Sequence, residues 1–177
     1  MYKKVMTLLV SIIAVFGLVA CGDTTTEEKE IESVGTSESS EEDKNDGDES
    51  SESSEVEEVG EVIADDDYVK ATLVSVEHVK DDLFEEEKYV INIDLENKTS
   101  DKIVVQARDV SIDGTMVDDM VFFSEEIAGE KNAKGKLEIQ NFDGDLPSMD
   151  ENLEFVLLII DDETFEDMAE HDVKIEF

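Results

Sequence analysis

Alternating apolar and polar positions predict short β-strands over the C-terminal two thirds of this chain. The clearest case lies at residues 89–96, where Tyr89, Ile91, Ile93 and Leu95 occupy every second position. A period of two places these side chains on one face of an extended strand, so this face is expected to be buried. The polar run 97–101 then predicts a turn.

The same pattern predicts further strands at residues 69–79, 103–107, 110–112, 136–139, 153–160 and 173–177, with a short apolar segment at 116–123. The phase slips by one at Arg108-Asp109, which would reverse the buried face, so this position marks a bulge, a bend or a break between two strands. Asp113-Gly114 is a hairpin signal. Residues 128–135 and 143–147 predict a loop and a turn. About seven short strands separated by turns favour an all-β fold, an antiparallel β-sandwich.

Residues 164–170 form the only segment that favours a helix, because acidic residues precede them; an irregular connection is the alternative. The neighbouring run 153–160 is apolar on both faces, whereas a sandwich strand normally shows one face to water. We expect the segment 164–170 to cover the second face through Phe165 and Met168. The alternative cover is a second protein, and large exposed patches are rare on monomers.

The chain begins with Lys3 and Lys4, followed by an uncharged apolar run over residues 5–20. This run is short for a membrane span, which needs roughly 20 residues, and the whole pattern is typical of an export signal. Residues 18–21 (LVAC) resemble the lipobox of bacterial lipoproteins. The resemblance implies that the chain is cut before Cys21 and that the Cys21 thiol carries a diacylglycerol group. A plain signal peptide with an ordinary thiol at Cys21 is the alternative.

From Gly22 to Gly60 the chain consists mostly of Glu, Asp, Ser and Thr, with almost no large apolar residues. Such a segment is expected to be disordered, because it cannot bury enough apolar surface to offset its ordering entropy. As a flexible tether of about 39 residues it would span roughly 35 Å. The expected organisation is a signal peptide at 1–20, a lipidated cysteine and acidic linker at 21–60, and one folded domain at 61–177. Cys21 is the only cysteine, so the domain has no internal disulfide.

A family resemblance covers about residues 69–177. Residues 89–98 (YVINIDLENK) are similar to the strand and Asn-Lys turn of immunoglobulin-like domains in Gram-positive lipoproteins, and 109–114 (DVSIDG) and 127–133 (IAGEKNA) resemble later parts of that pattern. The resemblance implies an immunoglobulin-like sandwich without assigned activity. No catalytic residues carry over from it.

Candidate chemistry in the domain is sparse. His78 and His171 have no cysteine or histidine at metal-ligand spacing, so both are expected to be surface or strand-edge histidines. Motifs for nucleophilic catalysis and glycine-rich phosphate loops do not occur. The sequon at residues 97–99 is expected to form a turn rather than a glycosylation site. We therefore expect a protein that is not an enzyme and needs no cofactor, with catalysis by paired carboxylates as the remaining enzymatic alternative.

The charge changes the expected partners. The chain has 50 acidic and 14 basic residues, a formal net charge of -36, and removal of Lys3 and Lys4 with the signal makes it about -38. Repulsion makes nucleic acid a poor partner. A basic peptide or protein, or divalent cations, fits better, and adaptation to salt would require no partner. The carboxylate runs at 65–67 and 161–163 are candidate calcium ligands, with a solvated acidic face as the alternative.

Together these patterns predict a monomeric lipoprotein held on the extracytoplasmic face of the cell membrane by lipid on Cys21. Its immunoglobulin-like domain would serve non-catalytic interaction or envelope support. A calcium- or cation-binding surface module is the alternative function. A two-lobed solute-binding protein is excluded, because one domain of this length cannot form two lobes.

Overall fold

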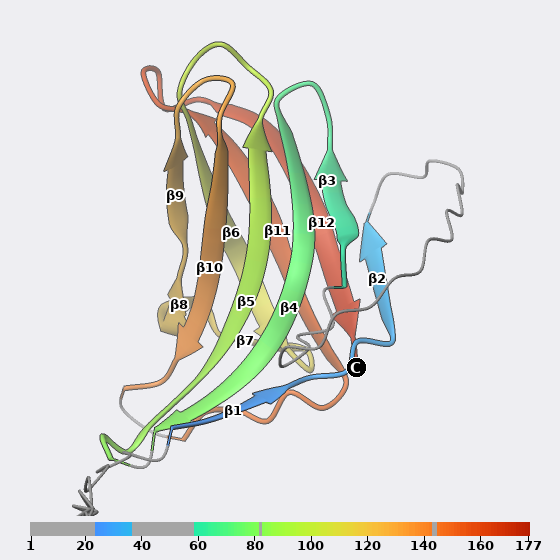
Figure 1. Ribbon diagram of the computed structural model, residues 1–177, viewed down its shortest axis with the longest axis vertical. Helices are drawn as coiled ribbons and strands as arrows, with labels where there is room; N and C mark the ends of the chain where they lie inside the picture. The colour runs from blue at the N-terminus through green and yellow to red at the C-terminus, as the bar shows by residue number, and fades with distance from the viewer. Residues whose placement is uncertain (1–23, 37–58, 82, 143–144) are drawn as a thin grey trace, which may run out of the picture.

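The computed structural model describes residues 24–36, 59–81, 83–142 and 145–177, which form two antiparallel β-sheets packed face to face (Figure 1). The fold is an all-β sandwich, as the alternation predicts. Its strands are β1 (Thr24–Glu28), β2 (Ser33–Thr36), β3 (Glu61–Asp65), β4 (Val69–Asp81), β5 (Glu86–Asn97), β6 (Ile103–Ile112), β7 (Thr115–Met116), β8 (Val121–Phe122), β9 (Ser124–Ile127), β10 (Asn132–Gln140), β11 (Asn152–Asp161) and β12 (Asp167–Glu176). A single turn of 3-10 helix, η1 (Asp118–Met120), precedes β8.

The first sheet is built on the long strands β4, β5 and β10, in the order β1-β4-β5-β10-β8. Two short strands share the outer edge of β4: β3 pairs with its first residues, and β1 pairs with its last ones, with Thr24 opposite Asp81. The second sheet has the order β2-β12-β11-β6-β7, and β9 adds to the start of β6. Each sheet therefore has edges completed by short segments from distant parts of the chain.

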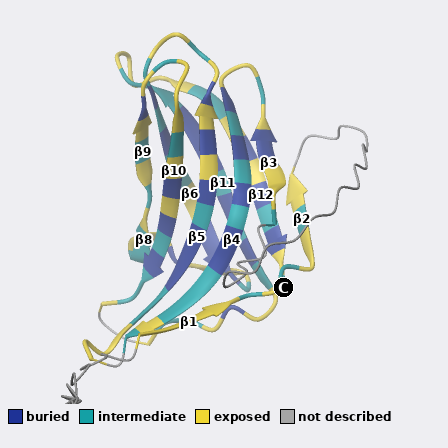
Figure 2. Ribbon diagram, in the orientation of Figure 1, coloured by how far each residue is buried: buried dark blue, intermediate teal, exposed yellow. Residues whose placement is uncertain are grey.

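The core lies between the two sheets. Tyr89, Ile91, Ile93 and Leu95 of β5 are buried, which confirms the strongest alternation in the sequence. Buried and exposed residues alternate along the strands (Figure 2), because successive side chains point to opposite faces. The inner row of β11 supplies the facing half of the core; it consists of Leu153, Phe155, Leu157 and Ile159.

The phase slip at Arg108-Asp109 is a β-bulge within one strand. Two residues of β6, Asp109 and Val110, lie opposite the single residue Phe155 of β11, and Asp109 has a φ of 51°. The hairpin predicted at Asp113-Gly114 joins β6 to β7, and both of its residues have positive φ, as the tight turn requires.

Two strands lie where disorder was expected. Residues 24–36 contain β1 and β2, so the expectation of a disordered linker over 21–60 is wrong for this part. Both strands attach mainly by backbone hydrogen bonds to the open edges of β4 and β12, and this pairing requires few apolar side chains. The apolar residues that are present, Ile31, Val34 and Val59, pack against the core. The rest of the linker, residues 37–58, lies outside the described residues, as does the signal peptide.

The helix expected at residues 164–170 does not form. Asp161 instead accepts backbone N–H bonds from Glu163 (3.0 Å) and Thr164 (2.7 Å), which closes a tight turn into β12. Phe165 is 78% exposed, so it does not cover the second face of β11. On that face, Leu158 lies between Gln106 of β6 and Glu170 of β12, whose aliphatic stems can shield it.

The two ends of the sandwich differ in the connections that they carry. The hairpin end carries the β4–β5 turn, the β10–β11 connection, the start of β1 and the C-terminus; the far end carries the β3–β4, β5–β6, β9–β10 and β11–β12 turns (Figure 1). Over the residues that the structure describes, no helix has the length and apolar character of a membrane span.

Candidate functional site

The predicted lipid-attachment residue, Cys21, lies outside the described residues, but the strand that follows it is well placed. β1 begins at Thr24, whose hydroxyl donates to Asp81 Oδ2 over 3.1 Å at the hairpin end. Three peptide units can span at most about 11 Å, so the Cys21 Cα must lie within this distance of the Thr24 Cα. The chain therefore leads from Cys21 almost directly into the sandwich.

Lys29 closes the hairpin end between the sheets. Its ammonium group donates to the carbonyl of Met149 and lies 5.6 Å from the ring centre of Tyr89 and 5.2 Å from that of Phe177. These distances place the cation within reach of both aromatic faces. The Tyr89 hydroxyl donates to the Pro147 carbonyl over 3.1 Å, and burial raises the pKa of Tyr89. This lysine fastens the segment that follows Cys21 to the core.

Apolar side chains are exposed near the same end. Leu83 and Phe84 occupy the β4–β5 turn, while Phe122 and Phe142 contact each other edge to face with ring centres 5.8 Å apart. All four belong to the large apolar residues that remain exposed in the described structure. They belong to the first sheet, which contains β4, β5, β8 and β10. Phe142 lies near the hairpin end because Gln140, two residues before it, pairs with Lys88 near the start of β5.

His171 is buried, with 8% of its surface exposed, so the expectation of a surface histidine is wrong for this residue. It does lie at a strand edge, because β2 pairs with β12 only from Val173 onward. It shares the inner face of β12 with Val173 and lies opposite Leu157. Its Nε2 is 3.0 Å from Asp66 Oδ2, while Asp66 Oδ1 accepts the backbone N–H groups of Tyr68 and Val69. The pair joins the β3–β4 turn to the second sheet and thereby satisfies a buried polar group.

His78 lies towards the hairpin end of β4. Its Nε2 is 2.7 Å from Glu87 Oε1, and its ring lies 4.7 Å from that of Tyr89. Lys80 reaches the same carboxylate oxygen at 3.0 Å. The hydrogen bond from Lys80 lowers the pKa of Glu87, against a smaller opposing effect of burial, and His78 adds to the lowering. Both histidines thus have structural partners on neighbouring elements.

Carboxylates of the two candidate calcium clusters form hydrogen bonds and ion pairs with other groups of the protein. The Asp65 carboxylate pairs with Lys98, and the Asp66 carboxylate binds His171 and two backbone N–H groups. Asp161 accepts the backbone and hydroxyl protons of Thr164, which lower its pKa. Within the described ranges, no group of three or more histidine, cysteine or acidic side chains is arranged to hold a metal ion.

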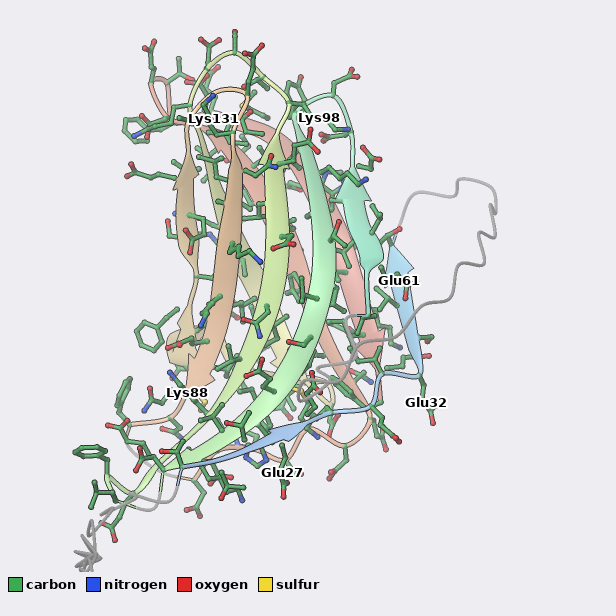
Figure 3. The ribbon with its side chains drawn as sticks, viewed as in Figure 1. Glu27, Glu32, Glu61, Lys88, Lys98 and Lys131 are labelled. Carbon is green, nitrogen blue, oxygen red and sulfur yellow. The ribbon has the colours of Figure 1, made fainter. Side chains whose placement is uncertain are left out.

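Lysines on the sandwich are largely engaged in ion pairs. Lys102 bridges Glu126 (2.7 Å) and Asp162 (3.0 Å), and Lys88 pairs with Glu138 (2.8 Å). Figure 3 shows Lys98 and Lys131 at the far end, with Lys88 and Glu27 towards the hairpin end. Because carboxylates greatly outnumber cations, the outer surface keeps a strong negative excess.

The outer face of each sheet carries one shallow depression. The one on the first sheet, of about 390 Å³, lies across β4, β5 and β10 and is lined mainly by Lys70, Thr72, Asp94, Glu96, Asn132 and Lys134. The one on the second sheet, of about 460 Å³, lies across β2, β12 and β11. The second is lined by both apolar and charged residues, among them Val156, Glu154 and Lys174. Open depressions of this kind are less suited to enclosing a small molecule than a concave, mostly apolar pocket.

A scan of protein-family models, a search of curated proteins and a search of solved structures each found no match to this chain.

Sequence reasoning missed three features of the hairpin end. The structural role of Lys29 could have been suspected from the sequence, because it is one of two basic residues in the acidic stretch and lies two positions before the apolar residue Ile31. The Leu83-Phe84 pair could also have been noticed in the sequence, because two large apolar residues interrupt an acidic turn. The proximity of Thr24 to this turn had no such signal in the sequence, because it depends on the pairing of β1 with β4.

Proposed function

We propose that this chain is a lipoprotein, exported and held on the extracytoplasmic face of the cell membrane by lipid on Cys21. The observation that carries the proposal is the lipobox-like sequence at residues 18–21, which ends three positions before the first strand at Thr24. Cleavage before Cys21 leaves this strand intact. Two acyl chains on the cysteine give stable anchoring, whereas one chain gives only marginal binding.

Comparison of the wild-type protein with Cys21→Ser tests the anchor. The wild type should be recovered from membranes with Cys21 as its first residue and with the mass of a diacylglycerol added. Cys21→Ser should lose this mass and the membrane retention that depends on it, while Gly22→Ala, one position further, should keep both. Recovery of the wild type with an unmodified Cys21 thiol would contradict the proposal.

The sandwich is proposed to be immunoglobulin-like. Its strand order supports this, since β4-β5-β10-β8 faces β12-β11-β6. In chain order these strands correspond to the A-B-E-D and G-F-C sheets of constant-type immunoglobulin domains. The short strands β1, β2, β3, β7 and β9 are additions at the edges of this arrangement.

The role proposed for the domain is non-catalytic interaction or support within the cell envelope, as a monomer. The observation in favour is that side chains of a type used in catalysis have structural partners: Nε2 of His78 contacts Glu87, and Nε2 of His171 contacts Asp66. The excess negative charge favours a basic protein or peptide as partner. Binding to such a partner should weaken steeply with added salt; turnover of a substrate that one point mutation abolishes would overturn the non-catalytic role.

A further inference from the structure

The β4–β5 turn presents two large apolar side chains to solvent. Leu83 is 67% and Phe84 is 68% exposed. Asp81 Oδ1 accepts the backbone N–H groups of Leu83 (2.9 Å) and Phe84 (3.2 Å), so the backbone of the turn is satisfied locally while its side chains project outward. Solvent-facing turns are normally built from Gly, Pro, Asn, Asp and Ser. The pair, here named the Leu83-Phe84 apex, is therefore an apolar surface that is unusual for a solvent-facing turn.

The apex lies beside the place where the chain arrives from Cys21. Thr24 pairs with Asp81 in the sheet and bonds to its carboxylate, and Asp81 also holds the apex backbone. With at most about 11 Å between the Cα atoms of Cys21 and Thr24, a lipid on Cys21 brings the bilayer to this end of the sandwich.

We propose that the Leu83-Phe84 apex enters the interfacial layer of the bilayer that holds the lipid on Cys21, and that it thereby orients the sandwich on the membrane. The inference rests on the proposed lipid anchor. Aromatic and aliphatic side chains bind at the boundary between headgroups and acyl chains. Attachment at Cys21 makes this contact intramolecular in effect, so a small apolar area suffices.

The surroundings of the apex define the kind of membrane surface that fits. Phe122 and Phe142 form a second exposed apolar pair, which belongs to the same sheet as the apex. Asp81, Glu85 and Glu86 flank the apex with negative charge, which keeps insertion shallow and is repelled by anionic headgroups. The apex therefore suits a surface of low charge, and added anionic lipid should weaken its insertion.

Tryptophan fluorescence of the lipidated full-length mature protein in phosphatidylcholine vesicles tests the inference. The chain has no tryptophan, so Phe84→Trp gives one signal. The matched control is Phe165→Trp, since Phe165 is also highly exposed but lies in the β11–β12 turn at the far end. Lipid brominated on its acyl chains should quench the indole of Phe84→Trp several-fold more than that of Phe165→Trp, and only the former emission should shift to shorter wavelength.

Flotation of the same samples tests the lipid anchor separately from insertion of the apex. If the protein floats with the vesicles and the Phe84→Trp indole is no more quenched than the control, the apex does not insert and the inference is overturned, while the anchor stands. A blue shift without quenching that depends on protein concentration would assign the apex to self-association instead. If the wild-type protein does not float, the anchor fails and the inference fails with it.

Discussion

Asn97 holds the turns of the far end together. Its side chain is 1% exposed, and its amide nitrogen donates to the carbonyls of Asp101 (2.8 Å) and Ile127 (3.0 Å). Its Oδ1 accepts both the backbone and hydroxyl protons of Thr99. These contacts use the full hydrogen-bonding capacity of a carboxamide. The predicted turn is confirmed, and the buried side chain explains why asparagine occupies this position.

Replacing Asn97 by aspartate should destabilise the domain. Asn97→Asp keeps the shape but removes both N–H donors and places a charge beside two carbonyl oxygens. The free energy of unfolding should fall by about 2 kcal/mol or more, measured by denaturant unfolding. Asn132→Asp, at an exposed position of β10, is the control and should change stability by less than about 0.5 kcal/mol. Equal effects of the two substitutions would refute this role of Asn97.

Asp113 clamps the start of β11 to the β6–β7 hairpin. Its carboxylate accepts the backbone N–H groups of Asp150 (3.0 Å), Glu151 (2.9 Å) and Asn152 (2.8 Å). Desolvation raises the pKa of Asp113, but these three bonds together outweigh it and leave the pKa below its ordinary value. The ionised form is therefore bound more favourably in the folded state than in the unfolded state.

The contribution of Asp113 should depend on pH in a defined direction. Because the folded pKa is the lower one, its stabilisation is complete above the unfolded pKa of about 3.9 and is lost as the pH falls through the folded pKa. Asp113→Asn tolerates the positive φ but lacks the second acceptor oxygen. The stability difference between wild type and variant, about 1–3 kcal/mol at neutral pH, should shrink below about pH 4. A difference that grows on acidification would contradict this assignment.

At the scale of elements, the β9–β10 turn packs directly against the β5–β6 turn. Glu130 N donates to Thr99 O over 2.8 Å, and a Cβ added at Gly129 would lie 2.0 Å from the backbone oxygen of Ser100. Only glycine allows this approach of two backbones. At Gly35 in β2, by contrast, an added Cβ has no neighbour within 4 Å.

This contrast provides a matched pair of substitutions. Gly129→Ala should destabilise the domain by more than about 2 kcal/mol, because backbone atoms must move apart. Gly35→Ala, the same chemical change at an open position, should alter stability by less than about 0.5 kcal/mol. Thermal unfolding of both variants checks this. A tolerated Gly129→Ala would mean that the two turns are not packed as described.

How much the sequence could predict also differs by element. Strands with one buried face, such as β5 and the end of β12, were predictable because burial imposes a period of two. The edge strands β1, β2 and β3 were not, because backbone pairing with a distant strand leaves little trace in the sequence. Local acidity at Asp161 suggested a helix start, but its side chain closes a turn instead. The His171–Asp66 contact joins residues 105 positions apart, so no local pattern could predict it.

For the whole molecule, the excess of carboxylates is a property of the surface and is not expected to form a cation site. The clusters at 65–67 and 161–163 use Asp65, Asp66 and Asp161 in contacts with lysine, histidine and backbone N–H groups. Calcium and sodium chloride at equal ionic strength should therefore raise the melting temperature equally, by screening repulsion. Thermal-shift titration checks this, and a saturable rise specific to calcium would restore the cation-binding alternative.

The arrangement on the membrane follows from the N-terminal strands. The sequence predicted a tether of roughly 35 Å between Cys21 and the domain. With β1 and β2 in the sheets, the acidic segment 37–58 instead connects β2 to β3, and a lipid on Cys21, as proposed, would attach close to the hairpin end. If the proposed anchor holds, the sandwich should stand on the membrane with its far end outward, about 40 Å away over the 12 residues of β5.

Energy transfer to acceptor lipids in vesicles tests this claim most directly. Fluorophores on Glu86→Cys, at the start of β5, and on Lys131→Cys, beside Asn97 at the far end, report the heights of the two ends above the bilayer. Transfer should be strong from the first label and weak from the second, because the two ends are separated by about 40 Å. Equal transfer from both labels would mean that the domain moves freely on a long tether, and it would contradict the account.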